Sequence, residues 1–236
     1  MAESEGPKMP RSQVNQIVLD AIAFCERMHF RLPPFASWSP ADWQTKGHEY
    51  DEIRDNRLGW DITDYGTGRF GEIGLVLFTI RNGNAAKPRI YPKSYCEKIM
   101  IVGEDQLCPY HHHRSKREDI INRGGGVLLV EVRNATESGE LLDTPVVLSI
   151  DGRVVEVPSQ HTIRLEPGES VTLPSYLHHK FWGETGKGPV LTGEVSAVND
   201  DETDNVFIPE YPRFPGIRPD VEPVHLMCWE YPGAGD

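Results

Sequence analysis

Apolar residues recur three and four positions apart near the start of the chain. This spacing predicts an amphipathic helix from Ser12 to Phe30, with Ser12 as its N-terminal cap and Pro33 and Pro34 beyond its end. The apolar positions are Val14, Ile17, Val18, Ala21, Ile22, Phe24 and Cys25. A second helix start follows at Ser39 and Pro40, and we expect that helix to reach about Asp55 or Arg57.

Beyond Leu58 the pattern changes to short β-rich runs separated by turn residues. The runs cover residues 75–80, 97–102, 126–132, 146–150, 162–165 and 190–196, and Asp151-Gly152 is the clearest hairpin turn. Strands without intervening helices indicate a sandwich or a barrel. We therefore expect an all-β-dominated single structural domain, with a helical arm at residues 1–57 and a barrel at residues 58–236. The part from about Asp200 onward is expected to wrap the barrel.

Composition excludes several classes of function. The 236 residues carry a formal net charge of -12, which argues against nucleic acid as a partner, because phosphate binding needs a basic surface. The four cysteines form no C-x-x-C pair, so a thiolate zinc cluster is not expected. No apolar run is long enough to span a membrane, and residues 1–14 lack the apolar segment of a signal peptide. We expect a cytoplasmic protein.

One segment has the spacing of a metal site. His111 and His113 are two residues apart, so on a strand both side chains point to the same face, and Glu118 follows after a short bend. Farther along, Gly168, Pro174 and His179 are separated by five and four residues, and His179 offers a fourth ligand. His112 and His178 have the opposite parity on their strands, so we expect them to point away from the metal.

This double pattern resembles that of the cupin family. Six residues separate Glu118 from Gly125, as in that family. Three positions depart from it: seven residues rather than five separate Gly103 from His111, Tyr176 replaces a glycine, and Gly183 replaces an asparagine. None of the three is a ligand. The resemblance implies a jelly-roll β-barrel that binds one divalent ion through His111, His113, Glu118 and His179.

Two further charged residues are candidates for catalysis. Lys116 lies between the ligands, and Glu194 interrupts an apolar run. An ammonium beside a metal-bound oxygen stabilises negative charge or moves a proton, and a carboxylate can act as a general base. The alternatives are a solvated lysine beside Arg114 and Arg117, and an exposed glutamate on a strand.

Aromatic and polar residues that occur together indicate a sugar site. Sugars stack their C–H faces on aromatic rings, and their hydroxyl groups bind carboxylates and amides. The candidates for substrate binding are Trp60, Asp61, Tyr65, Trp182, Asp204 and Arg213. For each aromatic residue the alternative is core packing, and for Asp204 and Arg213 it is plain surface charge.

Longer strings of residues are similar to the D-lyxose isomerase family of cupin sugar isomerases. They include Phe35-Ala-Ser-Trp38, Asn56 to Gly66, Lys116 to Gly126, Phe181-Trp-Gly-Glu184 and Gly193-Glu-Val-Ser196. The resemblance implies interconversion of D-lyxose and D-xylulose, often with D-mannose and D-fructose, and Mn²⁺ as the preferred metal. Co²⁺ or Zn²⁺ would also serve, because isomerisation needs no redox step.

The chemistry of the residues agrees with that implication. Three imidazoles and one carboxylate leave positions open for two sugar oxygens on a six-coordinate ion. We assign Glu194 as the base that moves the proton between C2 and C1, with Lys116 as its acid partner; the reversed assignment is the alternative. The rivals are a cupin dioxygenase with Fe²⁺ or Ni²⁺, a metal-stabilised sugar-binding cupin without catalysis, and a cupin phosphoglucose isomerase. Because a barrel has edges to cover, we expect a homodimer.

Overall fold

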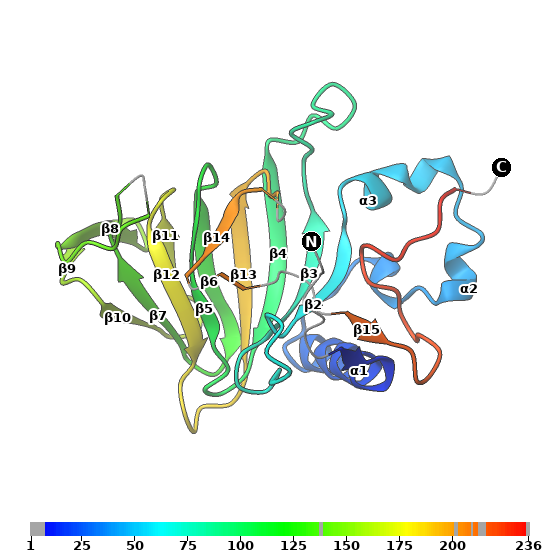
Figure 1. Cartoon of the computed structure of the whole chain (residues 1–236), viewed down its shortest axis with the longest axis horizontal. Coiled ribbons are helices and arrows are strands. Elements are labelled where there is room, and N and C mark those ends of the chain that lie inside the picture. Colours follow the sequence, from blue (N-terminus) through cyan, green and yellow to red (C-terminus); the bar gives the residue numbers. More distant parts are fainter. Residues whose placement is uncertain (1–7, 137–138, 201–202, 209, 212–215, 235–236) are drawn as a thin grey trace.

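Two facing β-sheets form the barrel of the computed structural model, which describes residues 8–136, 139–200, 203–208, 210–211 and 216–234 (Figure 1). The larger sheet has the order β2 (Gly59–Thr63), β3 (Leu75–Arg81), β4 (Tyr95–Val102), β13 (Val190–Ala197), β6 (Glu118–Gly125), β11 (Ser170–Leu173), β8 (Val146–Ile150), β9 (Arg153–Val157). The smaller sheet has the order β10 (His161–Leu165), β7 (Leu128–Arg133), β12 (His178–Gly183), β5 (Cys108–His113), β14 (Asn205–Phe207). The predicted cupin barrel, all-β-dominated with an N-terminal helical extension, is confirmed.

Side chains of β3 point alternately into two different hydrophobic cores. Leu75 and Leu77 point between the two sheets, where they join a core that includes Val130 of β7 and Phe181 of β12. Phe78 points to the outer face of the larger sheet and belongs to a second core. The strand therefore buries both of its faces, which explains why it is a continuous apolar run in the sequence.

The outer core lies beneath the helix α1 (Arg11–Arg27), which packs its apolar stripe onto the larger sheet (Figure 1). The expected cap was wrong. Pro10 occupies the N-cap position, and Ser12 lies inside the first turn, where its backbone N–H and hydroxyl both donate to Asp220. Next to this helix, β1 (Met9–Pro10) pairs in parallel with β15 (Ile217–Arg218).

The second predicted helix is replaced by shorter pieces. A capping box between Ser39 and Asp42 starts α2 (Pro40–Trp43) as the sequence indicated, but α2 lasts one turn, and α3 (Asp51–Asp55) begins after a separate 3-10 turn at His48–Tyr50. Thr45 binds the carbonyl of Asp42 with its hydroxyl, and Gly47 is a poor helix former. Trp43 is buried there against Tyr231, so tertiary packing rather than helix length holds the arm.

The hairpin at Asp151-Gly152 is confirmed. Both residues have positive φ, 48° and 79°, as a two-residue turn between twisted strands requires, and they join β8 to β9 in antiparallel pairing. None of the helices in the described part of the chain has both the length and the apolar character of a transmembrane helix.

The C-terminal segment contacts both regions of the molecule. Its strand β14 pairs with β5, with Asn205 opposite His113 and Phe207 opposite His111. Farther on, Cys228 donates its backbone N–H to the carbonyl of Trp60, and Glu230 forms an ion pair with Arg11 of α1. The segment thus covers the edge of the smaller sheet beside the candidate ligands and then returns to the helical arm.

Candidate metal centre

Four side chains from three strands converge inside the barrel. His111 and His113 come from β5, Glu118 opens β6, and His179 lies on β12 directly opposite His111 in the antiparallel pairing. Their ligand atoms all lie within 4.8 Å of one another, and all four side chains are buried. The strand pairing therefore brings together the four residues that the sequence selected.

Backbone contacts fix the orientation of two of the imidazoles. Nδ1 of His111 lies 2.8 Å from the carbonyl oxygen of Pro109, and Nδ1 of His179 lies 3.0 Å from that of Leu177. Because a carbonyl oxygen only accepts, each Nδ1 carries the proton and each Nε2 keeps a free lone pair. This is the tautomer that a metal-binding histidine needs.

The charge state of the cluster also suits a cation. Burial, followed by the neighbouring imidazoles of His179 and His113, holds the pKa of His111 well below its usual value. Burial and the ammonium of Lys116 lower the pKa of His113 as well. Burial alone would raise the pKa of Glu118, but Lys116 and His113 outweigh it, so this pKa lies well below its usual value. At neutral pH His111 and His113 are therefore neutral, and Glu118 is a carboxylate.

The geometry fits a divalent ion. Nε2 of His113 lies 3.3 Å from one carboxylate oxygen of Glu118, and Nε2 of His179 lies 3.1 Å from the other. Neighbouring ligands on an ion with bonds of about 2.1 Å lie about 3 Å apart. The Nε2 atoms of His113 and His179 are buried without a hydrogen-bond partner among the described residues. A cation would satisfy these two nitrogen atoms, because its bonds use their lone pairs.

A buried group of charges adjoins the four ligands. Nζ of Lys116 lies 2.8 Å from Glu118 and 2.8 Å from Glu194, and Nζ of Lys98 lies 3.7 Å from the other oxygen of Glu194. Burial acts to lower the pKa of Lys116, but the two carboxylates raise it overall. Burial acts to raise the pKa of Glu194, but the two lysines lower it overall. An ammonium and a carboxylate therefore face the ligand set in their charged forms.

Asp204 holds the loop that presents Lys116. Its carboxylate accepts hydrogen bonds from the backbone N–H groups of Ser115 and Lys116 and from the Ser115 hydroxyl, at 2.7, 3.2 and 2.6 Å. It also lies 3.7 Å from Nδ1 of His113. The sequence assigned Asp204 to substrate binding or to surface charge. In the structure it is buried and supports the loop between two metal ligands, so plain surface charge is excluded.

Of the aromatic candidates, Tyr65 lies at the site. It lines the cavity that contains His111, His113 and Glu118, and its hydroxyl lies 3.1 Å from Sγ of Cys108. Asp61, also predicted, is buried on the inward face of β2 but lines a separate cavity, together with Asn82 and Asn199.

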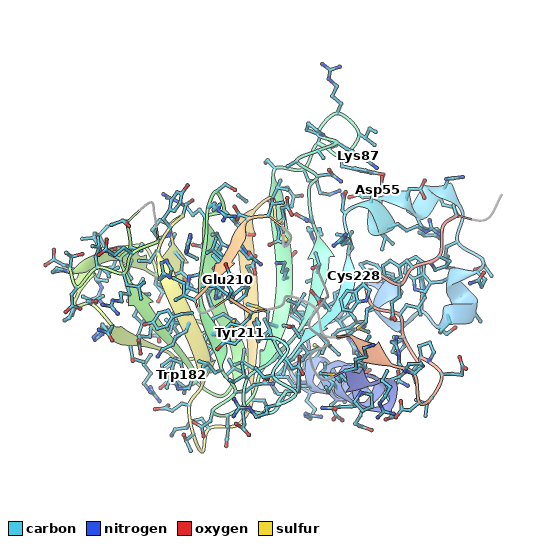
Figure 2. The ribbon with its side chains drawn as sticks, in the orientation of Figure 1. Asp55, Lys87, Trp182, Glu210, Tyr211 and Cys228 are labelled. Atoms are coloured by element: carbon cyan, nitrogen blue, oxygen red, sulfur yellow. The ribbon has the colours of Figure 1, made fainter. Side chains whose placement is uncertain are left out.

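The positions of Trp60 and Trp182 correct the sequence interpretation. Trp60 is 1% exposed in the outer core and donates its indole N–H to the carbonyl of Ala36, so it is a core residue. Trp182 follows the cavity residue Phe181 on β12 and therefore points to the opposite, outer face, where Lys180 lies over its ring. Figure 2 shows Trp182 at the margin of the barrel. Arg213 lies outside the described residues.

Several residues of the cavity were not predicted. Lys98 is a charged residue within an apolar strand. The sequence therefore contained the same signal for Lys98 as for Glu194. Asn205 and Phe207 reach the cavity from β14, and the ring of Phe207 stacks on that of His111 with 5.0 Å between the ring centroids. Only the pairing of β14 with β5 reveals these two residues.

The fold and the site together define a class of protein. The chain is a cupin barrel with a buried three-histidine, one-glutamate cluster that is compatible with a divalent metal. The profile of the D-lyxose isomerase family matches residues 9–231, and this chain belongs to that family. The family resemblance read from the sequence is therefore confirmed.

Similar proteins agree with this placement. The chain is 47% identical to the D-lyxose/D-mannose isomerase of Serratia proteamaculans, and the match covers 94% of this chain and 98% of that protein. It is also 47% identical to the protein of the same name from Escherichia coli O157:H7, with the same coverage. A structural neighbour is the L-ribose isomerase of Acinetobacter sp. DL28 in complex with L-ribose, with a TM-score of 0.57 and 16% identity. That match covers 91% of this chain and all of the neighbour. It supports the fold alone.

Proposed function

We propose that this protein is a metal-dependent aldose–ketose isomerase that interconverts D-lyxose and D-xylulose, and also D-mannose and D-fructose. Its relatives at 47% identity are named D-lyxose/D-mannose isomerases, and they match the chain over nearly its whole length. The site supports the same reaction, because isomerisation needs a proton acceptor, a proton donor and a group that stabilises negative charge on oxygen.

The buried contact between Lys116 and Glu194 beside the ligand set is the observation that supports catalysis most directly. The two side chains are 2% and 5% exposed, and 2.8 Å separates their charged atoms. An ion pair removed from water is costly unless it is fully paired. A cupin that only binds sugar or only uses metal for stability has no need of such a pair next to its ligands.

Each residue has a defined task in the proposed reaction. His111, His113, Glu118 and His179 would hold a divalent ion, which would supply Lewis acidity at the reacting end of the sugar. Glu194 takes the proton from C2 and returns it to C1, so that an enediolate forms and then collapses to the ketose. As Glu194 turns from Lys116 to the C2 proton, the N–H that faced Glu194 is released toward the sugar. Lys116 then gives a proton to O1, where negative charge develops, and takes the hydroxyl proton of O2 in return, so that the second proton of the reaction moves from O2 to O1.

Mn²⁺ is the metal that we propose, with Co²⁺ or Zn²⁺ as substitutes. The ligand set of three imidazoles and one carboxylate binds all three ions. The apolar lining of the cavity, which includes Leu77, Met100 and Ile120, limits water around the reacting atoms. We expect chelation to abolish turnover and Mn²⁺ to restore it best, at about one ion per chain by elemental analysis.

Isomerisation in D₂O followed by NMR tests the proposal. The Mn²⁺-loaded protein is separated from excess metal and incubated with D-lyxose, D-mannose or D-xylose, and the C1 and C2 protons are followed after removal of the ion. We expect ketose from D-lyxose fastest of the three, with some deuterium at the transferred position. Lyxose and mannose share the configurations at C2 and C3, so a site that binds near those hydroxyls accepts both and disfavours xylose.

The other outcomes separate the rival functions. Ketose formation without deuterium uptake would indicate a hydride shift or a fully shielded base. Sugar binding without exchange of the C2 proton would indicate a non-catalytic sugar-binding cupin. Oxygen consumption with Fe²⁺, and no reaction with any aldose, would indicate a dioxygenase.

A homodimer is the assembly that we propose. The strands β9, β10 and β14 lie at sheet edges, and edge strands carry unpaired backbone groups that a second copy can cover. Light scattering at micromolar protein concentration decides this, because a monomeric mass would contradict it.

A further inference from the structure

The ammonium group of Lys116 has three acceptors. Two are the carboxylates of Glu118 and Glu194, each at 2.8 Å, and the third is the side-chain oxygen of Asn199 at 3.3 Å. An ammonium carries three N–H donors, so each has one acceptor. The carboxylates belong to the metal site and to the proposed catalytic pair, whereas Asn199 is a neutral amide with no role in either.

Asn199 is itself held by a second asparagine. Nδ2 of Asn82 donates to the backbone carbonyl of Asn199 at 2.9 Å, and the backbone N–H of Asn199 donates to Oδ1 of Asn82 at 3.0 Å. One amide side chain thus binds both backbone groups of one residue. The contact ties the chain just after β13, which contains Glu194, to the chain just after β3.

Asn82 is anchored in turn. It is 5% exposed, and its own carbonyl accepts a hydrogen bond at 3.1 Å from Nδ2 of Asn56, which is also buried. The contacts therefore run without a break from the end of the helical arm, through Asn82 and Asn199, to the ammonium of Lys116. No water molecule is needed to connect them.

We propose that Asn82 and Asn199 are positioning residues for Lys116, an inference that rests on the proposed catalytic role of Lys116. A lysine side chain has four rotatable bonds, and holding it in one conformation costs entropy. Two carboxylates fix two of the ammonium donors. The amide of Asn199 fixes the third and thereby the direction of the group, and it does so without adding a third negative charge to the site.

Kinetics of four variants test this proposal. Asn199→Ala removes the acceptor, Asn82→Ala releases the backbone of Asn199, and the double variant removes both. Asn84→Ala is the matched control, since Asn84 lines the same cavity as Asn82 and Asn199 but forms its side-chain hydrogen bonds with residues 55, 56, 86 and 87. All variants are compared with D-lyxose at equal Mn²⁺ content per chain.

We expect Asn199→Ala to lower kcat by about tenfold with KM changed less than about twofold, because a misplaced acid affects the chemical step. Asn82→Ala lowers kcat through the same contact, so the kcat of the double variant should be no lower than that of Asn199→Ala. Asn84→Ala keeps kcat within about twofold of wild type. An unchanged kcat in Asn199→Ala, or losses that multiply in the double variant, would overturn the proposal.

Crystal structures of wild type and Asn199→Ala separate this inference from the proposed function. The inference requires that Nζ of Lys116 leaves hydrogen-bond reach of at least one of the two carboxylates in the variant. If wild type isomerises no aldose, the proposed function fails, and the position of Nζ still decides whether Asn199 orients the ammonium. An unmoved Nζ would contradict the inference even in an active enzyme.

Discussion

The two faces of the strands β5 and β12 both carry histidines, yet among the described residues only the inner face has a cluster that could hold a metal ion. His111, His113 and His179 point into the barrel and are between 1% and 6% exposed. His112 and His178 point outward and are 5% and 0% exposed, with ring centroids 4.3 Å apart. Burial and proximity are thus alike on both faces, and neither distinguishes the metal site.

The nearby charges make the difference. On the inner face the carboxylate of Glu118 lies within 3.3 Å of two imidazoles. On the outer face burial and then the other imidazoles lower the pKa of His178, with Arg133 adding to the effect. Among the described residues, no carboxylate forms a ligand cluster with His112 and His178. A metal site therefore needs converging lone pairs and a negative charge, whereas buried imidazoles alone form only a neutral pair.

Alanine substitution on the two faces should give the largest contrast. We expect His111→Ala or His179→Ala to lose the bound ion and to lower turnover by about 10³-fold or more, because each removes a ligand. His112→Ala and His178→Ala should keep about one ion per chain and most of the activity, although His178→Ala leaves a cavity and lowers the melting temperature. Elemental analysis and D-lyxose turnover measure both. Equal loss of metal in all four variants would remove the distinction between the faces.

The charged pair beside the ligands gives the next largest effect. Glu194→Gln should keep the ion and bind sugar but lower kcat by about 10²-fold or more, the usual contribution of a positioned general base. The matched control is Glu97→Gln on the neighbouring strand β4, because Glu97 forms an ion pair with Arg81, away from the cavity, at 2.9 Å. Steady-state kinetics compare the two variants. Similar kcat losses in both would show that Glu194 acts through general electrostatics and is not the base.

The cluster of candidate ligands could be predicted because the information that specifies it is local. Strand parity and spacing place His111, His113 and Glu118 within eight residues, and the second motif adds His179. Glu194 was found because a charge inside an apolar run is unusual. Lys98 gave the same signal and was overlooked.

Residues whose roles depend on distant pairing could not be predicted. Trp60 and Trp182 carry the sugar-site composition, but whether a strand residue points inward depends on the register of its sheet. Phe207 reaches His111 only because β14 adds to the edge of the smaller sheet. Asn82 and Asn199 are 117 positions apart, and no local pattern links them. The predicted length of the second helix was wrong because packing of Trp43 on Tyr231, rather than helix propensity, decides the path of the arm.

The outer histidine pair should make stability depend on pH. Burial and the imidazole of His112 lower the pKa of His178 from 6.5 to about 4. The unfolded chain therefore binds more protons between these values, so the stability from this residue is complete above pH 6.5 and is lost as pH falls toward 4. The loss stays below about 4 kcal/mol.

Substitution with Phe isolates this contribution. Phe has a similar size to histidine and does not titrate, so the free energy of unfolding of metal-free His178→Phe should fall less than that of wild type between pH 6.5 and 4. Urea unfolding at several pH values measures the difference, and above pH 7 the two curves should run parallel. Identical slopes throughout would mean that His178 is protonated in the folded protein at the same pH as in the unfolded chain.

The smallest expected effect comes from Trp182, and it tests the same two faces with an aromatic pair in place of histidines. Trp182 and Phe181 are neighbours on β12, but only Phe181 lines the ligand cavity, with its ring centroid 6.4 Å from that of His111. Trp182→Ala removes a half-buried ring and a contact with Lys180 worth about 0.5–1 kcal/mol, so kcat and KM for D-lyxose should stay within about twofold of wild type. Phe181→Ala should lower kcat/KM by more than that, because it enlarges the cavity next to a ligand. If Trp182→Ala instead raised KM tenfold while the melting temperature stayed constant, the sugar would contact the outer face of the smaller sheet, and the inward-facing cavity would be only part of the substrate site.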